Sequence, residues 1–207
     1  MSFTDWTGLT SLALVWVLLV LRLPVFVRLS GVQKIVFVVA AYGLALLPFF
    51  GLSLAAWLRG MLGDLSLTSV MLLSISVYRS VKINPGQSGA EPGWWNPRER
   101  FALLAFISVI ALLLYPFALG IGMVDPYRSG FAGVAFIVML ALLALWALRR
   151  SLTLLPLALA LAVLGWTVGW YESTNLWDYL IDAPLAIYAL VVILQSLLRN
   201  IGRGKRV

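Results

Sequence analysis

The chain has 207 residues, of which 62% are hydrophobic and only 11% are charged, and its formal net charge is +7. Because soluble domains carry about 25% charged residues, this composition excludes an ordinary water-soluble enzyme and indicates a polytopic membrane protein. Cysteine and histidine are both absent, so we expect no disulfide and no haem, iron–sulfur or zinc cofactor.

Seven apolar segments fill most of the chain, each close to the roughly 20 residues that cross the hydrocarbon core of a bilayer. They predict an all-α integral membrane fold, a bundle of seven transmembrane helices that forms a single domain over residues 1–207. The expected spans are 9–27, 35–57, 61–78, 101–124, 131–148, 152–171 and 176–198.

Basic residues accumulate in the cytoplasmic loops of membrane proteins. If the N-terminus lies outside and the C-terminus inside, all of the 15 basic residues except Arg59 and Arg128 fall on the cytoplasmic side. The linker 79–100 and the basic tail 199–207 lie on that side. The net charge therefore predicts contact with the anionic lipids of the bilayer and no binding to nucleic acid. We expect a multi-pass protein of a bacterial inner membrane.

The first apolar segment contains one charge, Arg22, two residues before Pro24. The first interpretation of Arg22 is that its long side chain reaches the lipid headgroups. The alternative is that it binds a polar partner inside the helix bundle, such as a row of serine hydroxyls in the third segment. That row consists of Ser66, Ser69 and Ser76 and predicts either a helix-packing seam or a polar permeation path. A re-entrant third segment would reduce the count to six spans and worsen the charge asymmetry.

Proline and glycine are frequent in the linker 79–100, which predicts irregular structure. Within it Trp94 and Trp95 are adjacent. Together with Trp177, at the start of the last span, they are candidate anchors, either at the membrane interface or for a partner protein. The last span contains no lysine, which excludes a retinal Schiff base.

The segment 171–184 is rich in acidic and aromatic residues. We expect Asn175 to cap a helix with Asp178 as the acidic partner of a capping box, and Pro184 to cause a kink or restart. The functional alternative is an outer carboxylate cluster that binds a divalent cation or a cationic group of a solute. Its candidate members are Asp125, Glu172, Asp178 and Asp182. Spacing alone does not bring Asp125 to the others, and no metal site is assigned.

No catalytic constellation can be assembled from the sequence, so a function without catalysis is favoured. The leading hypothesis is an accessory or scaffold subunit of an envelope membrane complex, because aromatic anchors are expected on both faces. The alternative is a transporter for a small or amphipathic solute with an acidic outer mouth. A membrane enzyme of lipid or glycan modification that uses the outer carboxylates is the third hypothesis.

Overall fold

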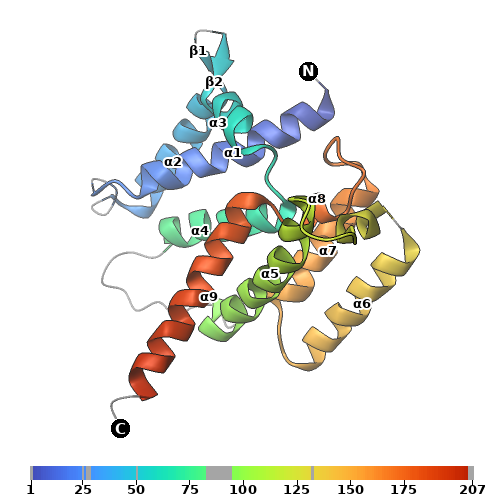
Figure 1. Ribbon diagram of the computed structural model, residues 1–207. Helices are drawn as coiled ribbons and strands as arrows, with labels where there is room; N and C mark the ends of the chain where they lie inside the picture. The colour runs from blue at the N-terminus through green and yellow to red at the C-terminus, as the bar shows by residue number, and fades with distance from the viewer. Residues whose placement is uncertain are drawn as a thin grey trace.

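The computed structural model describes residues 2–24, 26, 29–49, 51–82, 95–131 and 133–204, with the backbone alone for 200–204. Over these residues the chain is mostly helical, as the sequence predicts (Figure 1). The longer helices are α1 (Phe3–Leu21), α2 (Gly31–Leu46), α4 (Leu67–Lys82), α5 (Pro97–Ala118), α6 (Val134–Arg149), α7 (Leu154–Thr167) and α9 (Ala183–Gly204). The short elements are strands β1 (Pro48–Phe49) and β2 (Leu52–Ser53), and helices α3 (Leu54–Leu62), η3 (Pro126–Phe131) and α8 (Trp177–Leu180).

Side-chain caps fix where several helices begin. Ser2 with Asp5 and Ser30 with Gln33 form capping boxes at the starts of α1 and α2. Asn96 accepts a hydrogen bond from the Glu99 N–H at the start of α5. Each of these contacts satisfies a backbone N–H that has no partner within its helix.

The expected segment 35–57 is interrupted. Leu47 is extended, as the residue before a proline prefers, and Pro48 then starts an antiparallel pair of two-residue strands in which it faces Ser53. The next expected segment, 61–78, is also divided, because α3 ends at Leu62 and Gly63 takes a positive φ of 75°. Turn-forming residues inside apolar runs therefore break two segments that length alone predicts as continuous.

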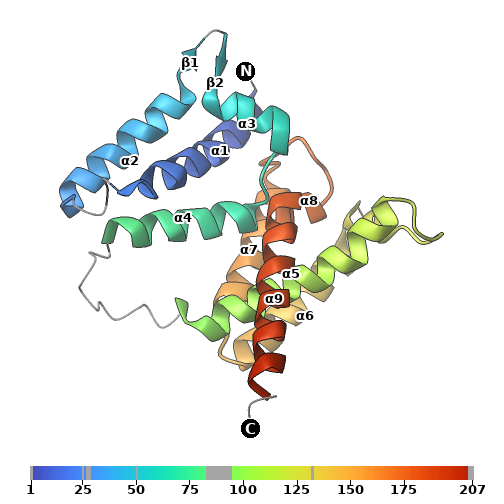
Figure 2. The same cartoon turned by 60° about the vertical axis from the view of Figure 1, so that its left-hand side comes forward.

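The helices pack as two sets that meet at α4 (Figure 2). Helix α1 contacts α2, α3 and α4 around a small core that includes Leu12, Ala45 and Ala55. The second set consists of α5 to α9, with α5 against α9 and α6 against α7. Because α4 contacts α7 and α8 as well as α1, it joins the two sets.

Within the described residues, two helices are both long and apolar enough to cross a membrane, Phe3–Leu21 and Pro97–Ala118. Gly31–Leu46, Val134–Arg149, Leu154–Thr167 and Ala183–Arg199 are apolar but shorter. Large apolar side chains are exposed on several helices, among them Val32 at 73% on α2, Leu142 at 62% on α6 and Leu194 at 57% on α9. Extensive exposed apolar surface is typical of contact with lipid or with another protein.

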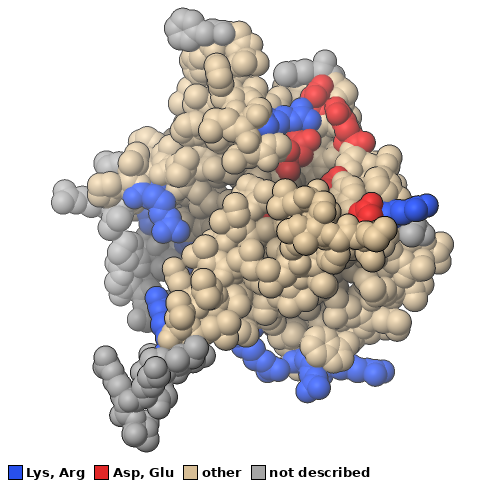
Figure 3. Space-filling model, in the orientation of Figure 1, with Lys and Arg blue, Asp and Glu red and all other residues tan. Residues whose placement is uncertain are grey.

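Charged side chains are unevenly distributed over the surface. Figure 3 shows the acidic groups gathered at the upper right of the visible face, with basic groups beside them, and most other basic groups along the left and lower margins. The N-terminal end of α1 and the short helix α8 lie at the acidic end (Figure 1). On this face most acidic groups therefore lie at one end, which we name the acidic end, and most basic groups lie away from it, toward what we name the basic end.

Candidate functional site

Two neighbouring cavities share Leu62 in their walls. We name them the acidic cavity, of about 340 Å³, and the leucine-lined cavity, of about 360 Å³. The acidic cavity is lined by Leu62, Asp64, Tyr115, Tyr171, Ser173, Asp178, Ile181, Asp182 and Ala183. The leucine-lined cavity is lined by Val15, Leu18, Arg22, Leu62, Leu65, Ser69, Leu72, Leu73, Ser76, Trp95, Arg100, Leu103, Leu104, Pro184, Leu185 and Tyr188.

Asp178 lies in the wall of the acidic cavity and binds two hydroxyl groups. The phenol of Tyr127 donates to its two carboxylate oxygens at 2.9 and 2.8 Å, and Ser173 donates at 2.5 Å. Burial, and then the contact with Asp178, raise the pKa of Tyr127 above its usual value. The Tyr127 phenol therefore stays a hydrogen-bond donor at neutral pH and holds the carboxylate in place.

The capping box predicted for Asn175 and Asp178 is wrong. Asn175 accepts a hydrogen bond from the Trp177 N–H, and its amide donates to the carbonyl oxygen of Tyr127. Helix α8 is a single turn whose cap makes no side-chain hydrogen bond. Hydroxyl groups from η3 and the preceding loop bind Asp178 in place of the expected backbone group. Pro184 does mark a restart, because it lies in the first turn of α9, where its missing N–H needs no partner.

Asp182 joins the beginnings of two helices. Its carboxylate accepts from the backbone N–H of Ser66 at 2.7 Å and from that of Leu185 at 2.8 Å. The side chain is 8% exposed. Because these two hydrogen bonds connect the start of α4 to the start of α9, Asp182 fixes the edge of the acidic cavity between the two helices.

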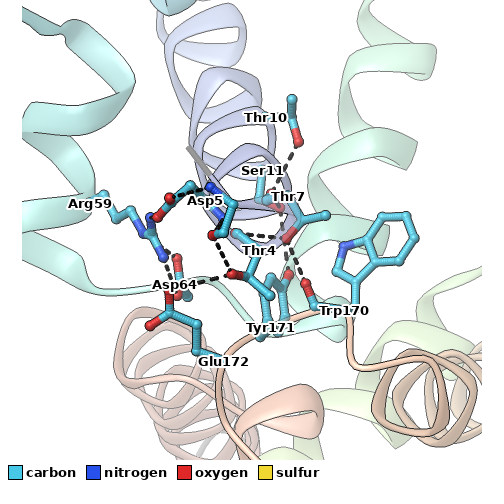
Figure 4. A network of polar contacts seen from close by, with 11 residues as sticks. Thr4, Asp5, Thr7, Thr10, Ser11, Arg59, Asp64, Trp170, Tyr171 and Glu172 are labelled. Carbon is cyan, nitrogen blue, oxygen red and sulfur yellow. Dashed lines mark hydrogen bonds and ion pairs between the residues drawn. The ribbon is translucent and has the colours of Figure 1, made fainter.

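Asp64 belongs to an ion-pair network with Asp5 and Arg59 (Figure 4). The Arg59 guanidinium binds both oxygens of Asp64, at 2.7 and 3.0 Å, and reaches Asp5 at 2.9 Å. Hydrogen bonds from the Ser2 backbone and from Arg59 lower the pKa of Asp5 to about 2. The network ties the start of α1 to the turn between α3 and α4.

A second set of contacts at the start of α1 reaches across the molecule (Figure 4). The Thr7 hydroxyl donates to the carbonyl oxygen of Trp170 at 2.6 Å, and Thr4 donates to Glu172 at 3.4 Å. Asp125 accepts from the Tyr127 N–H in its own loop. Neither Glu172 nor Asp125 lines the acidic cavity.

The four predicted acids are thus divided between several places. Asp178 and Asp182 line one cavity, with Asp64 as the third carboxylate, and Asp125 and Glu172 lie elsewhere. In the part of the chain that the structure describes, no group of three or more acidic side chains has a metal-binding arrangement. The wall of the acidic cavity carries carboxylates together with the hydroxyl groups of Tyr115, Tyr171 and Ser173, and such groups can accept hydrogen bonds.

The serine row faces the leucine-lined cavity in part. Ser69 and Ser76 line it, together with Arg22, which is exposed at the end of α1. Ser66 is fully buried and donates to the Ser69 hydroxyl at 3.3 Å. The structure therefore places Arg22 and two hydroxyls of α4 around the same space.

The candidate tryptophan anchors are buried where they are described. Trp95 is 5% exposed, and the guanidinium groups of Arg79 and Arg100 lie 5.1 and 5.3 Å from its ring centroid. Trp177 is 8% exposed and donates to the Ser129 hydroxyl at 3.1 Å. Trp94 lies outside the described residues. Trp95 and Trp177 thus pack inside the chain, where a partner protein cannot contact them.

Sequence reasoning missed Asp64, Arg59, Tyr115 and Arg100. The sequence does give an indication of the Arg59–Asp64 ion pair, because Arg59 is one of the two basic residues expected on the outer side and Asp64 follows five positions later. The sequence identifies Arg100 only as a basic residue at the end of the linker 79–100, although its guanidinium donates to the Tyr188 hydroxyl at 3.2 Å. No pattern in the sequence brings α5 and α9 together at this point.

No family model, no curated protein and no solved structure matches the chain.

Proposed function

We propose that the chain is a multi-pass membrane protein that binds and transports a small amphipathic solute between α1, α4, α5 and α9. The proposal includes seven spans with the N-terminus outside and the C-terminus in the cytoplasm of a bacterial cell. It has two parts, membrane embedding and solute passage, which are supported by different observations.

Membrane embedding is supported by the agreement between the expected spans and the long helices. Each of the seven apolar segments overlaps one of α1, α2, α4, α5, α6, α7 and α9. At 1.5 Å per residue, helices of 14 to 22 residues are about 21 to 33 Å long, compared with a core of about 30 Å. The shorter helices cross with the help of flanking residues. The acidic end of the molecule then faces outward and the basic end faces the cytoplasm.

Solute passage rests on one observation, the wall shared by the two cavities. Leu62 borders both of them. From there the acidic cavity leads to Asp178, at the acidic end. The leucine-lined cavity leads past Ser69 and Ser76 to Arg22, at the end of α1. Polar groups at both ends and leucines between them suit a solute that has an apolar body and a polar group.

The transport hypothesis now has more support than the accessory subunit that the sequence favoured. The accessory hypothesis depends on exposed aromatic anchors, and Trp95 and Trp177 are buried. The enzyme hypothesis remains a third proposal. Within the described residues, Asp178 and Asp182 already bind hydroxyl and backbone donors, which suits a fixed binding surface.

The test is flux into vesicles that contain the purified chain. The probes are ethidium, an amphipathic cation trapped by enclosed DNA, and a fluorescent short-chain phospholipid whose inner-leaflet fraction is measured by dithionite quenching. Leu62→Trp should reduce flux to the rate of protein-free vesicles, because the larger side chain would block the space where the two cavities meet. Leu142→Trp is the matched control, since Leu142 is exposed on α6 and lies outside both walls.

Two results would overturn the transport proposal. The first is wild-type flux of both probes at the protein-free rate. The second is an equal loss of flux in the Leu62 and Leu142 variants, which would show that the added indole acts through folding or lipid contact. Ser69→Ala provides an independent measurement on the same path, because it removes a hydroxyl from the cavity wall with little change in volume.

A further inference from the structure

The leucine-lined cavity is amphipathic, because arginine side chains are part of its otherwise largely apolar wall. Arg22 and Arg100 both contribute to its wall. Arg79 lies close by, because its guanidinium and that of Arg100 both contact the Trp95 ring. Burial, and then the charge of Arg100, lower the pKa of Arg79, as expected where cations are brought together.

The three arginines come from helix ends, namely the C-terminal ends of α1 and α4 and the N-terminal end of α5. Val15, Leu18 and Arg22 follow one stripe of α1, and Arg22 comes last. Arg100 lies in the first turns of α5. The C-terminal ends of α1 and α4 lie toward the left in both ribbon views, away from α8 (Figures 1 and 2). Leu62 borders the opposite end, beside the acidic cavity.

Apart from the hydroxyl groups of Ser69, Ser76 and Tyr188, the remaining wall is apolar. Leucine is its most frequent residue, as at Leu72 of α4 and Leu104 of α5. Tyr188, which is 46% exposed, and the exposed Arg22 are also part of the wall, so the cavity reaches the molecular surface. A space of about 360 Å³ accepts an extended hydrocarbon chain that enters from the side.

We propose that this cavity binds an anionic phospholipid, with its phosphate at Arg22 and Arg100 and one acyl chain among the leucines. Guanidinium groups hold phosphate oxygens through charge-assisted hydrogen bonds, and the acyl chain supplies the apolar contact. The inference goes beyond transport, although it rests on the membrane embedding proposed above. A lipid bound there occupies space that a solute needs, so lipid and solute compete.

The binding test is retention of lipid by the purified full chain in native mass spectrometry, with phosphatidylglycerol or phosphatidylcholine added to the detergent. We expect preferential retention of phosphatidylglycerol. Arg22→Gln and Arg100→Gln should each weaken that retention about tenfold, or about 1.4 kcal/mol. Leu72→Trp should weaken retention of both lipids by filling the acyl space. Arg149→Gln is the control, because it removes the same charge from an exposed position outside the cavity wall.

The alternatives give distinct outcomes. Equal retention of the two lipids, or an equal loss in the Arg149 variant, would overturn the proposal. Stabilisation of the chain by inorganic phosphate to the same extent as by phosphatidylglycerol would show a phosphate site without a lipid. Arg100→Lys keeps the charge and should retain the lipid if Arg100→Gln is poorly folded. Binding is measured without flux, so a failure of transport leaves this result unaffected.

Discussion

At the residue scale, Arg59 explains how a basic side chain is accommodated among acids. It binds Asp64 through two hydrogen bonds and Asp5 through a third. The side chains are only partly exposed, at 23% for Arg59 and 33% for Asp5, so the pair is neither deeply buried nor fully hydrated. The bidentate geometry with Asp64 makes the contact more specific than an ordinary surface ion pair.

Asp5 should make the stability of the chain depend on pH in the acid range. Its pKa is about 2 in the folded chain and 3.8 ordinarily, so the stabilising contribution is complete above about pH 4 and is lost as the pH falls towards 2. Asp5→Asn should therefore show a smaller drop in thermal midpoint between about pH 5 and pH 2.5 than the wild type. Asp125→Asn is the control and should keep the wild-type drop. A wild-type drop in the Asp5 variant would contradict this assignment.

Gly130 lies where a side chain has no space. A Cβ atom there would overlap the Asn175 Oδ1 and lie 2.6 Å from Trp177 Cδ1. Gly130→Ala should destabilise the fold by about 1–3 kcal/mol, the usual cost of overpacking. Gly60→Ala is the matched control, because nothing lies within 4 Å of its Cβ position, and alanine stabilises a helix by about 0.5–1 kcal/mol relative to glycine. Denaturant unfolding measures both, and similar midpoints would refute the expected clash.

At the element scale, Glu99 connects two helices. It lies in the first turn of α5, is 3% exposed, and accepts hydrogen bonds from the N–H groups of Thr153 and Leu154 at the start of α7. A carboxylate at a helix N-terminus gains from the helix dipole as well as from the hydrogen bonds. A side chain of one helix therefore caps another that lies more than 50 residues away.

Replacing Glu99 should loosen the start of α7. Glu99→Ala leaves buried N–H groups without a partner, at a cost of about 1–3 kcal/mol, and amide hydrogen exchange at residues 153–155 should become faster. Glu99→Gln keeps a neutral acceptor and should lose less. Unchanged exchange at these amides in the alanine variant would show that the cap contributes nothing to α7.

The sequence predicted helices well and their interruptions less well. Within the described residues, each of the seven long helices overlaps one of the apolar segments that length alone predicts. Length alone kept 35–57 as one span, because the residues that flank Pro48 are as apolar as those of a continuous span, whereas the proline itself is the signal for the break. The predicted capping box is wrong for another reason. Asp178 accepts a hydrogen bond from Tyr127, which is 51 residues away, and no local sequence pattern indicates so distant a partner. Asp178 and Asp182 were predicted as site residues, whereas Asp64 enters the acidic cavity only through the turn after α3.

At the scale of the whole molecule, the separation of acidic and basic ends should correspond to the two sides of a membrane. Because the chain lacks cysteine, single substitutions can report the side directly. In sealed right-side-out vesicles, Met123→Cys should react with a membrane-impermeant maleimide, and Arg150→Cys should react only after permeabilisation. Both positions are exposed, so reactivity reports accessibility. Labelling of both in sealed vesicles would contradict the proposed topology.

The contact between Thr7 and Trp170 has a consequence for biosynthesis. The two residues are 163 positions apart, so the ribosome makes most of the chain before this partner of α1 exists. Such distant contacts form late, because the intervening chain must first be placed. In the membrane topology proposed above, we therefore expect α1 to be inserted early and to reach its final position only after the segment that contains Trp170 has been made.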